Sequence, residues 1–254
     1  MEENNKSKDN KTKNRKIVVL TIIRILLIVV LLISIIFIIS WCINSKQNEI
    51  IEEKISNVVI IENEDSLEEY KINFEKLKEV NNQIVCWIKV NGTNIEYPIV
   101  QAEDNSYYLK KNLEKKYNTG GWIFLDYKNK LDGTDKNIVI YGHNMTDDSM
   151  FGTLKNVLTE DWYNNEENYI IDFITDKEKQ KYQVFSVYQI KTEDYYIDTE
   201  FKEGEFEDFV STLKVRSKKD FGVEVSGDDA ILTLSTCANN YRDRIVLHAK
   251  KIEK

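Results

Sequence analysis

The apolar residues of this chain follow two different patterns. Residues 25–43 form an uninterrupted run of 19 uncharged, mostly aliphatic positions. At a rise of about 1.5 Å per residue, a helix of this length spans about 28 Å, which matches the hydrocarbon thickness of a bilayer. From residue 84 onward, apolar and polar positions alternate in short segments with a period of two, which is typical of strands. The pattern therefore predicts one membrane-spanning helix followed by a mainly β domain.

The residues that flank the apolar run predict its orientation. Residues 17–23 extend it beyond Arg24, whose long side chain can carry the guanidinium to the lipid headgroups, and Trp41 suits the opposite interface. Residues 1–16 carry six basic and three acidic side chains, which favours a cytoplasmic N-terminus and places residues 44–254 outside. A cleaved signal peptide is the alternative, but its apolar core would be shorter and would end at a small-residue cleavage site.

We expect four segments from this organisation. They are a basic cytoplasmic tail (1–16), a transmembrane signal anchor (17–43), a stalk or first helix (44–65) and an extracellular domain (66–254). A chain of 254 residues leaves room for one sizeable domain after the anchor. The overall net charge of −8 argues against a nucleic-acid partner, because no excess of Lys and Arg is available to neutralise phosphates.

Eight segments of the outer domain have strand character. They are residues 84–90, 95–101, 121–125, 137–141, 169–174, 182–190, 230–236 and 244–250. The dipeptide Asn91-Gly92 between the first two is a strong hairpin signal. Many short strands with few helices predict a mainly β fold, a closed barrel or a sandwich.

Three helices are predicted around these strands. A capping box at Ser66–Glu69 predicts a helix over residues 66–80. A shorter helix is expected around residues 149–157. Apolar residues at helical spacing predict a third helix ahead of the last two strands; they are Phe206, Phe209, Val210 and Leu213.

Cys237 is the first residue that could carry chemistry. It follows the apolar segment 230–236 and therefore stands at the end of a strand, where a loop begins. The alternative is a buried structural thiol, as the apolar flanks of Cys86 indicate for that residue. An exposed, unpaired thiol outside the cell is prone to oxidation, which favours a functional role for Cys237.

Two histidines and two arginines are candidate partners for such a thiol. His143 stands just past the strand 137–141, whereas His248 lies inside a strand and is interpreted as structural. A single histidine can activate a thiol and protonate a leaving amine. Arg242 or Arg244 could stabilise an oxyanion from the adjoining strand. Three cysteines without a Cys-x-x-Cys pair, together with two histidines, leave too few ligands for a zinc site, so neither a metal nor another cofactor is expected.

These residues resemble the motifs of the sortases, specifically class B. The matching segments are Thr-Leu-Ser-Thr-Cys at 233–237, Tyr-Gly-His-Asn at 141–144 and Arg244 ahead of Ile-Val-Leu-His-Ala. The similarity extends through most of residues 66–252 and includes residues 87–101 and 104–109. The resemblance implies an eight-stranded sortase-type β-barrel with N-terminal helices and a helix inserted before the last two strands.

The resemblance also implies an activity, that of an extracellular cysteine transpeptidase of Gram-positive cell walls. Cys237 would be the nucleophile, His143 the general acid and base, and Arg244, rather than Arg242, the cation that binds the oxyanion or positions the substrate. The positions matching the class B substrate groove are Asn105, Leu109, Tyr141, Tyr196, Ile197 and Ser235.

The implied partners are two substrates and a membrane. One substrate is a secreted protein with a C-terminal sorting motif, of the NPxTx type, and the other is an amine of peptidoglycan or of its lipid-linked precursor. Two alternatives stay open at this point: a pilin-polymerising transpeptidase, and a membrane-tethered, peptide-binding β-barrel without catalysis.

Overall fold

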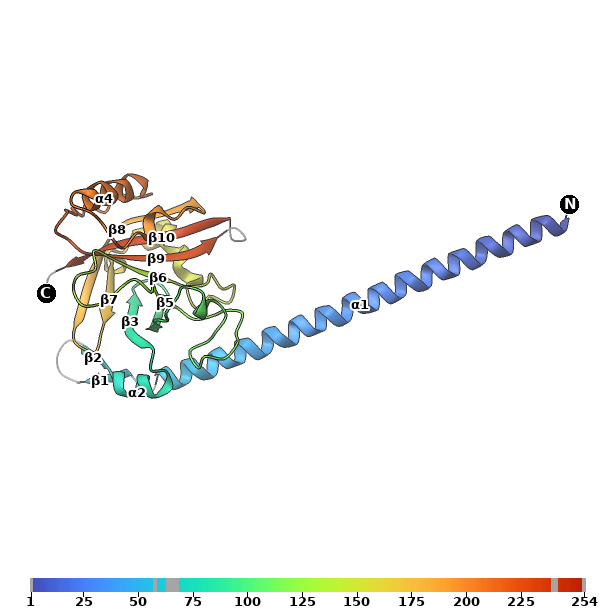
Figure 1. Ribbon diagram of the computed structural model, residues 1–254, viewed down its shortest axis with the longest axis horizontal. Helices are drawn as coiled ribbons and strands as arrows, with labels where there is room; N and C mark the ends of the chain where they lie inside the picture. The colour runs from blue at the N-terminus through green and yellow to red at the C-terminus, as the bar shows by residue number, and fades with distance from the viewer. Residues whose placement is uncertain (1, 57–58, 63–68, 239–241, 253–254) are drawn as a thin grey trace. The chain divides into compact units, whose positions relative to one another are not determined.

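The computed structural model describes residues 2–56, 59–62, 69–238 and 242–252. The chain forms two compact units, residues 1–50 and 51–254. Helix α1 (Glu2–Ser56) accounts for the first unit and ends in the second (Figure 1). Its segment Lys16–Ile43 has a mean hydropathy of 3.4, and none of its most apolar stretch is buried, so it is long and apolar enough to cross a membrane.

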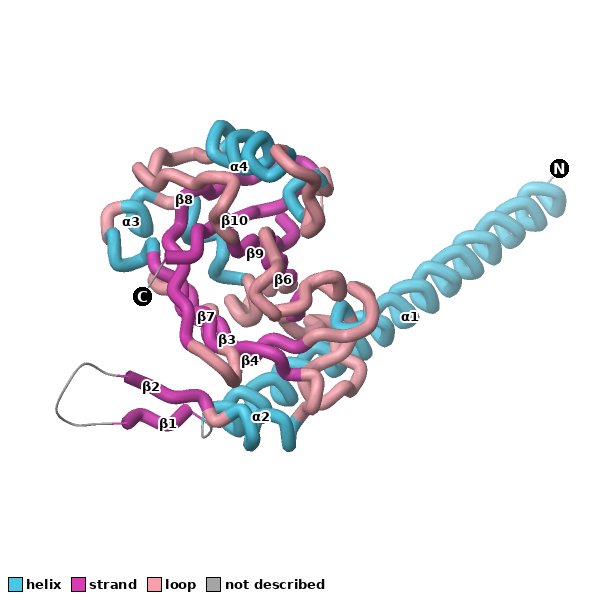
Figure 2. Tube along the Cα trace, turned by 60° about the vertical axis from the view of Figure 1, so that its left-hand side comes forward, coloured by secondary structure: helices cyan, strands magenta, loops and turns pink. Residues whose placement is uncertain are grey.

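The second unit is built around a closed eight-stranded barrel (Figures 1 and 2). Its strand order is β10-β8-β7-β3-β4-β5-β6-β9. The strands are β3 (Ile84–Val90), β4 (Glu96–Val100), β5 (Phe124–Leu125), β6 (Asn137–Tyr141), β7 (Ile170–Ile174), β8 (Lys179–Lys191), β9 (Ile231–Ala238) and β10 (Asp243–Ile252). Neighbouring strands are antiparallel except for the pairs β4–β5 and β6–β9, which are parallel. The eight-stranded barrel predicted from the sequence is confirmed.

Large apolar side chains fill the barrel and hold its strands together. Trp87 and Ile88 of β3, Phe173 of β7 and Leu247 of β10 are among the side chains that are at most 2% exposed. Burial of each such side chain stabilises the fold by about 1.5–3 kcal/mol relative to an exposed position. The predicted hairpin is present between β3 and β4, where Gly92 adopts a φ of +69°.

Short helices surround the barrel. They are α2 (Phe74–Val80), α3 (Glu160–Tyr163), α4 (Glu205–Arg216) and the 3₁₀ helices η1 (Tyr107–Leu109), η2 (Gly152–Leu158), η3 (Glu166–Tyr169) and η4 (Tyr195–Ile197). Helix α4 lies along β8 on the outside of the barrel (Figure 2) and buries Phe206, Val210 and Leu213 in a second apolar cluster. The helix predicted ahead of the last two strands is therefore present.

The segment before the barrel differs from the sequence prediction. A helix was expected over residues 66–80, but α2 begins only at Phe74, where the Asn73 side chain accepts a hydrogen bond from the amide of Lys76. The preceding residues form strand β2 (Glu69–Ile72), which pairs with β1 (Val59–Glu62) in an antiparallel hairpin. Strand pairing thus overrides the local capping signal, whose first residues, 66–68, lie outside the described residues.

Candidate active site

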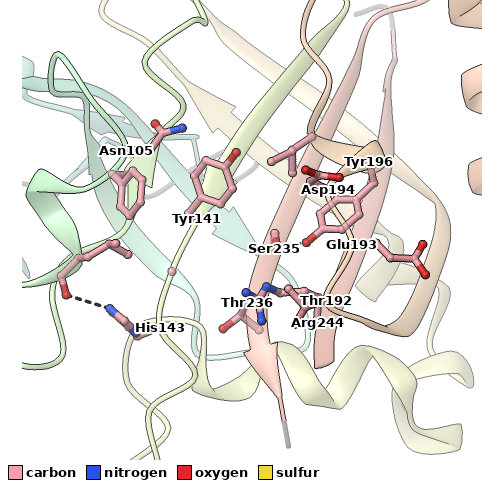
Figure 3. Close-up of a pocket in the computed structure, with 14 residues that line it drawn as sticks. Asn105, Tyr141, His143, Thr192, Glu193, Asp194, Tyr196, Ser235, Thr236 and Arg244 are labelled. Atoms are coloured by element: carbon pink, nitrogen blue, oxygen red, sulfur yellow. Dashed lines mark hydrogen bonds between the residues drawn. The ribbon is translucent and has the colours of Figure 1, made fainter. Parts of the chain in front are cut away.

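A pocket of about 450 Å³ lies at one end of the barrel, where β6 and β9 finish side by side (Figure 3). These strands run parallel, with Tyr141 opposite Ser235, and the amide of Gly142 donates to the carbonyl of Ser235 over 3.2 Å. The residues that line the pocket are Asn105, Leu109, Phe124, Tyr141, Gly142, His143, Thr192, Glu193, Asp194, Tyr196, Ile197, Ser235, Thr236 and Arg244. Residues distant in the sequence therefore meet at one carboxyl-terminal edge of the sheet.

Strands β9 and β10 bring Cys237 and Arg244 together. The antiparallel register places Cys237 directly opposite Arg244, and the Arg244 side chain lines the pocket. Paired residues of neighbouring strands have Cβ atoms only about 4.5–5.5 Å apart. Arg242 lies outside both β10 and the pocket, with an exposed side chain, and its carbonyl accepts from the amide of Thr192 over 3.0 Å. The register thus pairs Arg244, and not Arg242, with Cys237.

His143 follows β6 and enters the pocket from another side. Its Nε2 lies 2.9 Å from the carbonyl oxygen of Leu109. Because a carbonyl can only accept, Nε2 carries the proton of the neutral ring, and Nδ1 is left as the basic nitrogen. Figure 3 shows His143 turned toward this carbonyl at one side of the pocket and Arg244 beside Thr236 at the other. The imidazole therefore has a defined tautomer, with one nitrogen available for proton transfer.

A buried carboxylate fixes two further side chains of the pocket. Asp126 is 3% exposed, and its Oδ2 accepts hydrogen bonds from Asn105 Nδ2 and from the Tyr141 hydroxyl, each at 2.8 Å. Burial, with the Asp126 charge beside it, raises the pKa of Tyr141, so that hydroxyl remains a donor. Asn105 also accepts from the amide of Tyr127 at 3.0 Å. The Asn105 and Tyr141 side chains are thereby held in one orientation at the pocket wall.

Comparison with known proteins identifies the family of this chain. The family model of the sortase domain matches residues 88–252. Sortase B of Staphylococcus aureus is 35% identical over 220 residues, which is 85% of this chain and 89% of that protein. The chain belongs to the class B sortases.

Solved sortase B structures agree with this assignment. The Bacillus anthracis sortase B in complex with AAEK1 superimposes with a TM-score of 0.72 at 33% identity, covering 84% of this chain and 99% of that one. The Staphylococcus aureus sortase B–substrate complex gives a TM-score of 0.66 at 38% identity, covering 71% of this chain and 84% of that one. As a class B sortase, the protein is a cysteine transpeptidase, and sortases are enzymes of the cell wall.

The predicted groove residues of this sortase lie around one pocket. All six predicted groove positions line the pocket, as do His143 and Arg244; the six are Asn105, Leu109, Tyr141, Tyr196, Ile197 and Ser235. The Tyr196 hydroxyl lies 3.0 Å from the Ser235 hydroxyl, which joins η4 to β9 at the pocket. Cys86 is fully buried in β3, and His248 is fully buried in β10, as expected for structural residues. Among the described residues, no group of three or more His, Cys, Asp or Glu side chains is placed to hold a metal ion.

Sequence reasoning missed several residues that line the sortase pocket or hold its wall in place. Asp126 stands directly after the apolar pair Phe124–Leu125, and an acidic residue at the end of a buried strand was the available signal. Thr236 is 2% exposed, and its hydroxyl has no hydrogen-bond partner among the described residues. Glu193 and Asp194 add carboxylates to the wall formed by the segment before η4. No local sequence pattern distinguishes Glu193 and Asp194 from ordinary acidic residues at the protein surface.

The position of His143 depends on Gly121, and this dependence gives a testable prediction. Gly121 has a φ of +58°, and a Cβ there would lie 2.4 Å from the Tyr108 carbonyl oxygen and 2.8 Å from that of Leu109, the His143 acceptor. Gly121→Ala should therefore displace this carbonyl and lower kcat/KM for transpeptidation by about tenfold to a hundredfold. Steady-state kinetics of the full-length protein would measure the effect.

Gly133→Ala is the matched control. Gly133 has a φ of +89°, but a Cβ there meets nothing within 4 Å. Both variants carry the backbone strain of an L-residue at positive φ, so both should lose thermal stability. Only Gly121→Ala should lose activity, and equal kcat/KM in the two variants would contradict the role of the Leu109 carbonyl.

Proposed function

We propose that this sortase cleaves a C-terminal sorting motif of secreted proteins, of the NPxTx type, after its Thr. It then joins the new carboxyl end to an amine of peptidoglycan or of its lipid-linked precursor through a thioester on Cys237. The observation that carries the proposal is the register of β9 and β10, which pairs Cys237 with Arg244 at the pocket that His143 also lines. A thiol, an acid–base group and a cation around one bound carbonyl are the groups that acyl transfer through a thioester needs.

The proposed reaction has two acyl transfers. His143 takes the proton of the Cys237 thiol, and the sulfur attacks the Thr carbonyl. Arg244 stabilises the tetrahedral oxyanion, and the C–N bond breaks as His143 gives that proton to the departing amine. The acceptor amine then attacks the thioester, loses a proton to His143 and releases the thiol. Because Nε2 of His143 is bonded to the Leu109 carbonyl, Nδ1 is the nitrogen that exchanges the proton in both steps.

The pocket wall suits an extended peptide. Leu109, Tyr196 and Ile197 offer apolar surface, while Asn105, Tyr141 and Ser235 offer polar groups. The Staphylococcus aureus relative has been solved with a substrate, and a sortase B has been solved with triglycine, a peptide that carries a free amine. Both structures support a site that receives first a peptide and then an amine.

We also propose the topology of the chain. Residues 1–16 would remain in the cytoplasm, residues 17–43 would span the membrane once, residues 44–65 would link the two parts, and residues 66–254 would form the extracellular catalytic domain. The basic residues of the tail favour this orientation. The transpeptidase is thereby held at the membrane surface, where secreted proteins and lipid-linked wall precursors are both present.

The experiment that tests the proposed function uses the cysteines of the chain. Full-length protein in detergent is incubated with an NPxTx peptide and an amine acceptor, and the cleaved and ligated products are quantified. Cys237→Ala should abolish both products, whereas Cys42→Ala should leave them unchanged, because Cys42 lies in the apolar segment of α1. Product formation by the Cys237→Ala variant would refute the assignment of the nucleophile.

A further inference from the structure

A chain of buried hydrogen bonds runs through His248, a histidine that does not line the pocket. His248 Nδ1 lies 2.9 Å from the Thr233 hydroxyl, and its Nε2 lies 3.0 Å from the Tyr188 hydroxyl. The Thr233 hydroxyl donates to Asn137 Oδ1 at 2.7 Å, and the Tyr188 hydroxyl lies 2.9 Å from that of Tyr195. His248, Thr233 and Asn137 are fully buried, and Tyr188 is 3% exposed.

The donors and acceptors of this hydrogen-bond network can be arranged in only one way. The amide nitrogen of Asn137 donates to two backbone carbonyls, so its Oδ1 faces Thr233, whose single proton is used there. Thr233 therefore accepts from His248 Nδ1–H. Burial lowers the pKa of His248 to about 3, so the ring is neutral and its Nε2 accepts from Tyr188. Tyr188 in turn accepts from Tyr195, and every group in the chain is satisfied.

Both ends of this hydrogen-bond network bind the same short segment, which consists of η4 and the next residue, Asp198. At one end the Tyr195 hydroxyl donates to Tyr188. At the other end Asn137 donates to the carbonyls of Tyr196, at 3.3 Å, and Asp198, at 2.9 Å. Tyr196 and Ile197 of this segment line the pocket. Three points of one turn are thus connected to a single buried network.

The outer side of the same turn is held less firmly. The Arg216 guanidinium lies over the Tyr195 ring, 4.6 Å from its centroid, and pairs with Glu193 at 3.6 Å. Both side chains of that ion pair are about half exposed, and exposed pairs of this kind contribute little. The position of η4 therefore depends mainly on buried contacts, which are this network and the hydrogen bond between the hydroxyls of Tyr196 and Ser235.

We propose that the Tyr188–His248–Thr233–Asn137 network is a positioning device for the peptide-binding wall, and that His248 is its central positioning residue. The network sets the affinity for the sorting peptide and leaves the acyl-transfer steps unchanged, because it contacts η4 and does not line the pocket. This inference rests on the proposed function, in which η4 contacts the peptide.

Removal of one hydroxyl tests the proposal. Tyr188→Phe breaks the bonds to both His248 and Tyr195 without changing the shape of the side chain. We expect KM for the NPxTx peptide to rise about fivefold with kcat within twofold of wild type, since a buried hydrogen bond is worth about a factor of this size. The Kd of the peptide, measured on the Cys237→Ala background, should rise by the same factor.

Tyr182→Phe is the matched control. Tyr182 lies on the same strand, is 1% exposed, donates to Gln180 at 3.0 Å and lies outside the pocket. Its removal should lower the thermal midpoint without raising KM. Thr233→Val breaks the network from the other end and should reproduce the KM effect, so it decides the question if Tyr188→Phe fails to fold.

Two results would overturn the inference. One is an unchanged KM in folded Tyr188→Phe and Thr233→Val, and the other is a loss of kcat or a KM change shared equally by Tyr182→Phe. These outcomes are separate from failure of the proposed function, which would appear as no turnover by wild-type protein or as full turnover by Cys237→Ala.

Discussion

Replacing His143 with alanine is expected to lower kcat/KM for transpeptidation about a thousandfold, the usual contribution of general acid–base catalysis. The reason is that Nδ1 of this ring has no hydrogen-bond partner among the described residues, whereas Nε2 is engaged with the Leu109 carbonyl. The other histidine, His248, is fully buried and bonded at both nitrogens, so it cannot take over. Peptide cleavage by the full-length protein measures the loss.

A glutamine at position 143 separates chemistry from structure. Its amide nitrogen can still donate to the Leu109 carbonyl, but it has no group that titrates near neutral pH. His143→Gln should therefore fold normally and be as inactive as His143→Ala, and added imidazole should restore part of the activity of the alanine variant. Activity of either variant within tenfold of wild type would show that another group transfers the proton.

Arg244→Ala is expected to lower kcat/KM about a hundredfold to a thousandfold, the range observed when a group that stabilises an oxyanion is removed. Arg244 is paired with Cys237 across β9 and β10 and its side chain lines the pocket. Arg244→Lys should keep a minor part of the activity, because it retains the charge but loses the planar fork of donors. Single-turnover acylation rates measure the effect directly.

Arg242→Ala is the matched control for this prediction. The two residues have the same side chain and are two positions apart, but Arg242 is exposed and precedes β10. Its removal should change kcat/KM less than twofold. The reverse result, a large loss at Arg242 and a small one at Arg244, would assign the functional cation to the loop and contradict the register argument.

The barrel could be predicted because its strands are short, alternating and rich in branched and aromatic residues. The most overpredicted strand among them is β5, predicted over 121–125 but formed only by Phe124–Leu125. Gly121 has a positive φ, and the amide of Trp122 donates to the carbonyl of Tyr108 instead of to a neighbouring strand. The segment at Tyr108 therefore forms the hydrogen bond that a neighbouring strand would form if β5 began at residue 121.

The segment before the barrel could not be predicted from local signals. The capping box at 66–69 and the apolar spacing favoured a helix, yet Glu69–Ile72 pairs with a strand more than six residues earlier in the chain. The predicted stalk or first helix at 44–65 likewise divides into the end of α1, where Ile51 and Ile55 are buried, and strand β1. Pairing between β1 and β2 decides the structure of residues 59–62 and 69–72, and local helix signals do not reveal it.

The site was predicted from motifs at the ends of strands, and its supporting groups were not. His143 and Arg244 stand at strand ends, where parallel and antiparallel pairing brings them to one pocket. Asp126 and Gly121 act through the side chain or carbonyl of another residue. Their roles depend on contacts between loops, which spacing along the chain does not reveal.

Formation of a covalent intermediate tests the central claim most directly. Full-length protein is mixed with an NPxTx peptide in the absence of an amine acceptor, quenched rapidly in acid and analysed by intact mass and peptide mapping. The proposal predicts a mass increase equal to the peptide fragment that ends in Thr, located on Cys237, removed by hydroxylamine and absent from Cys237→Ala. Turnover of the peptide with no adduct, or with the adduct on another residue, would contradict it.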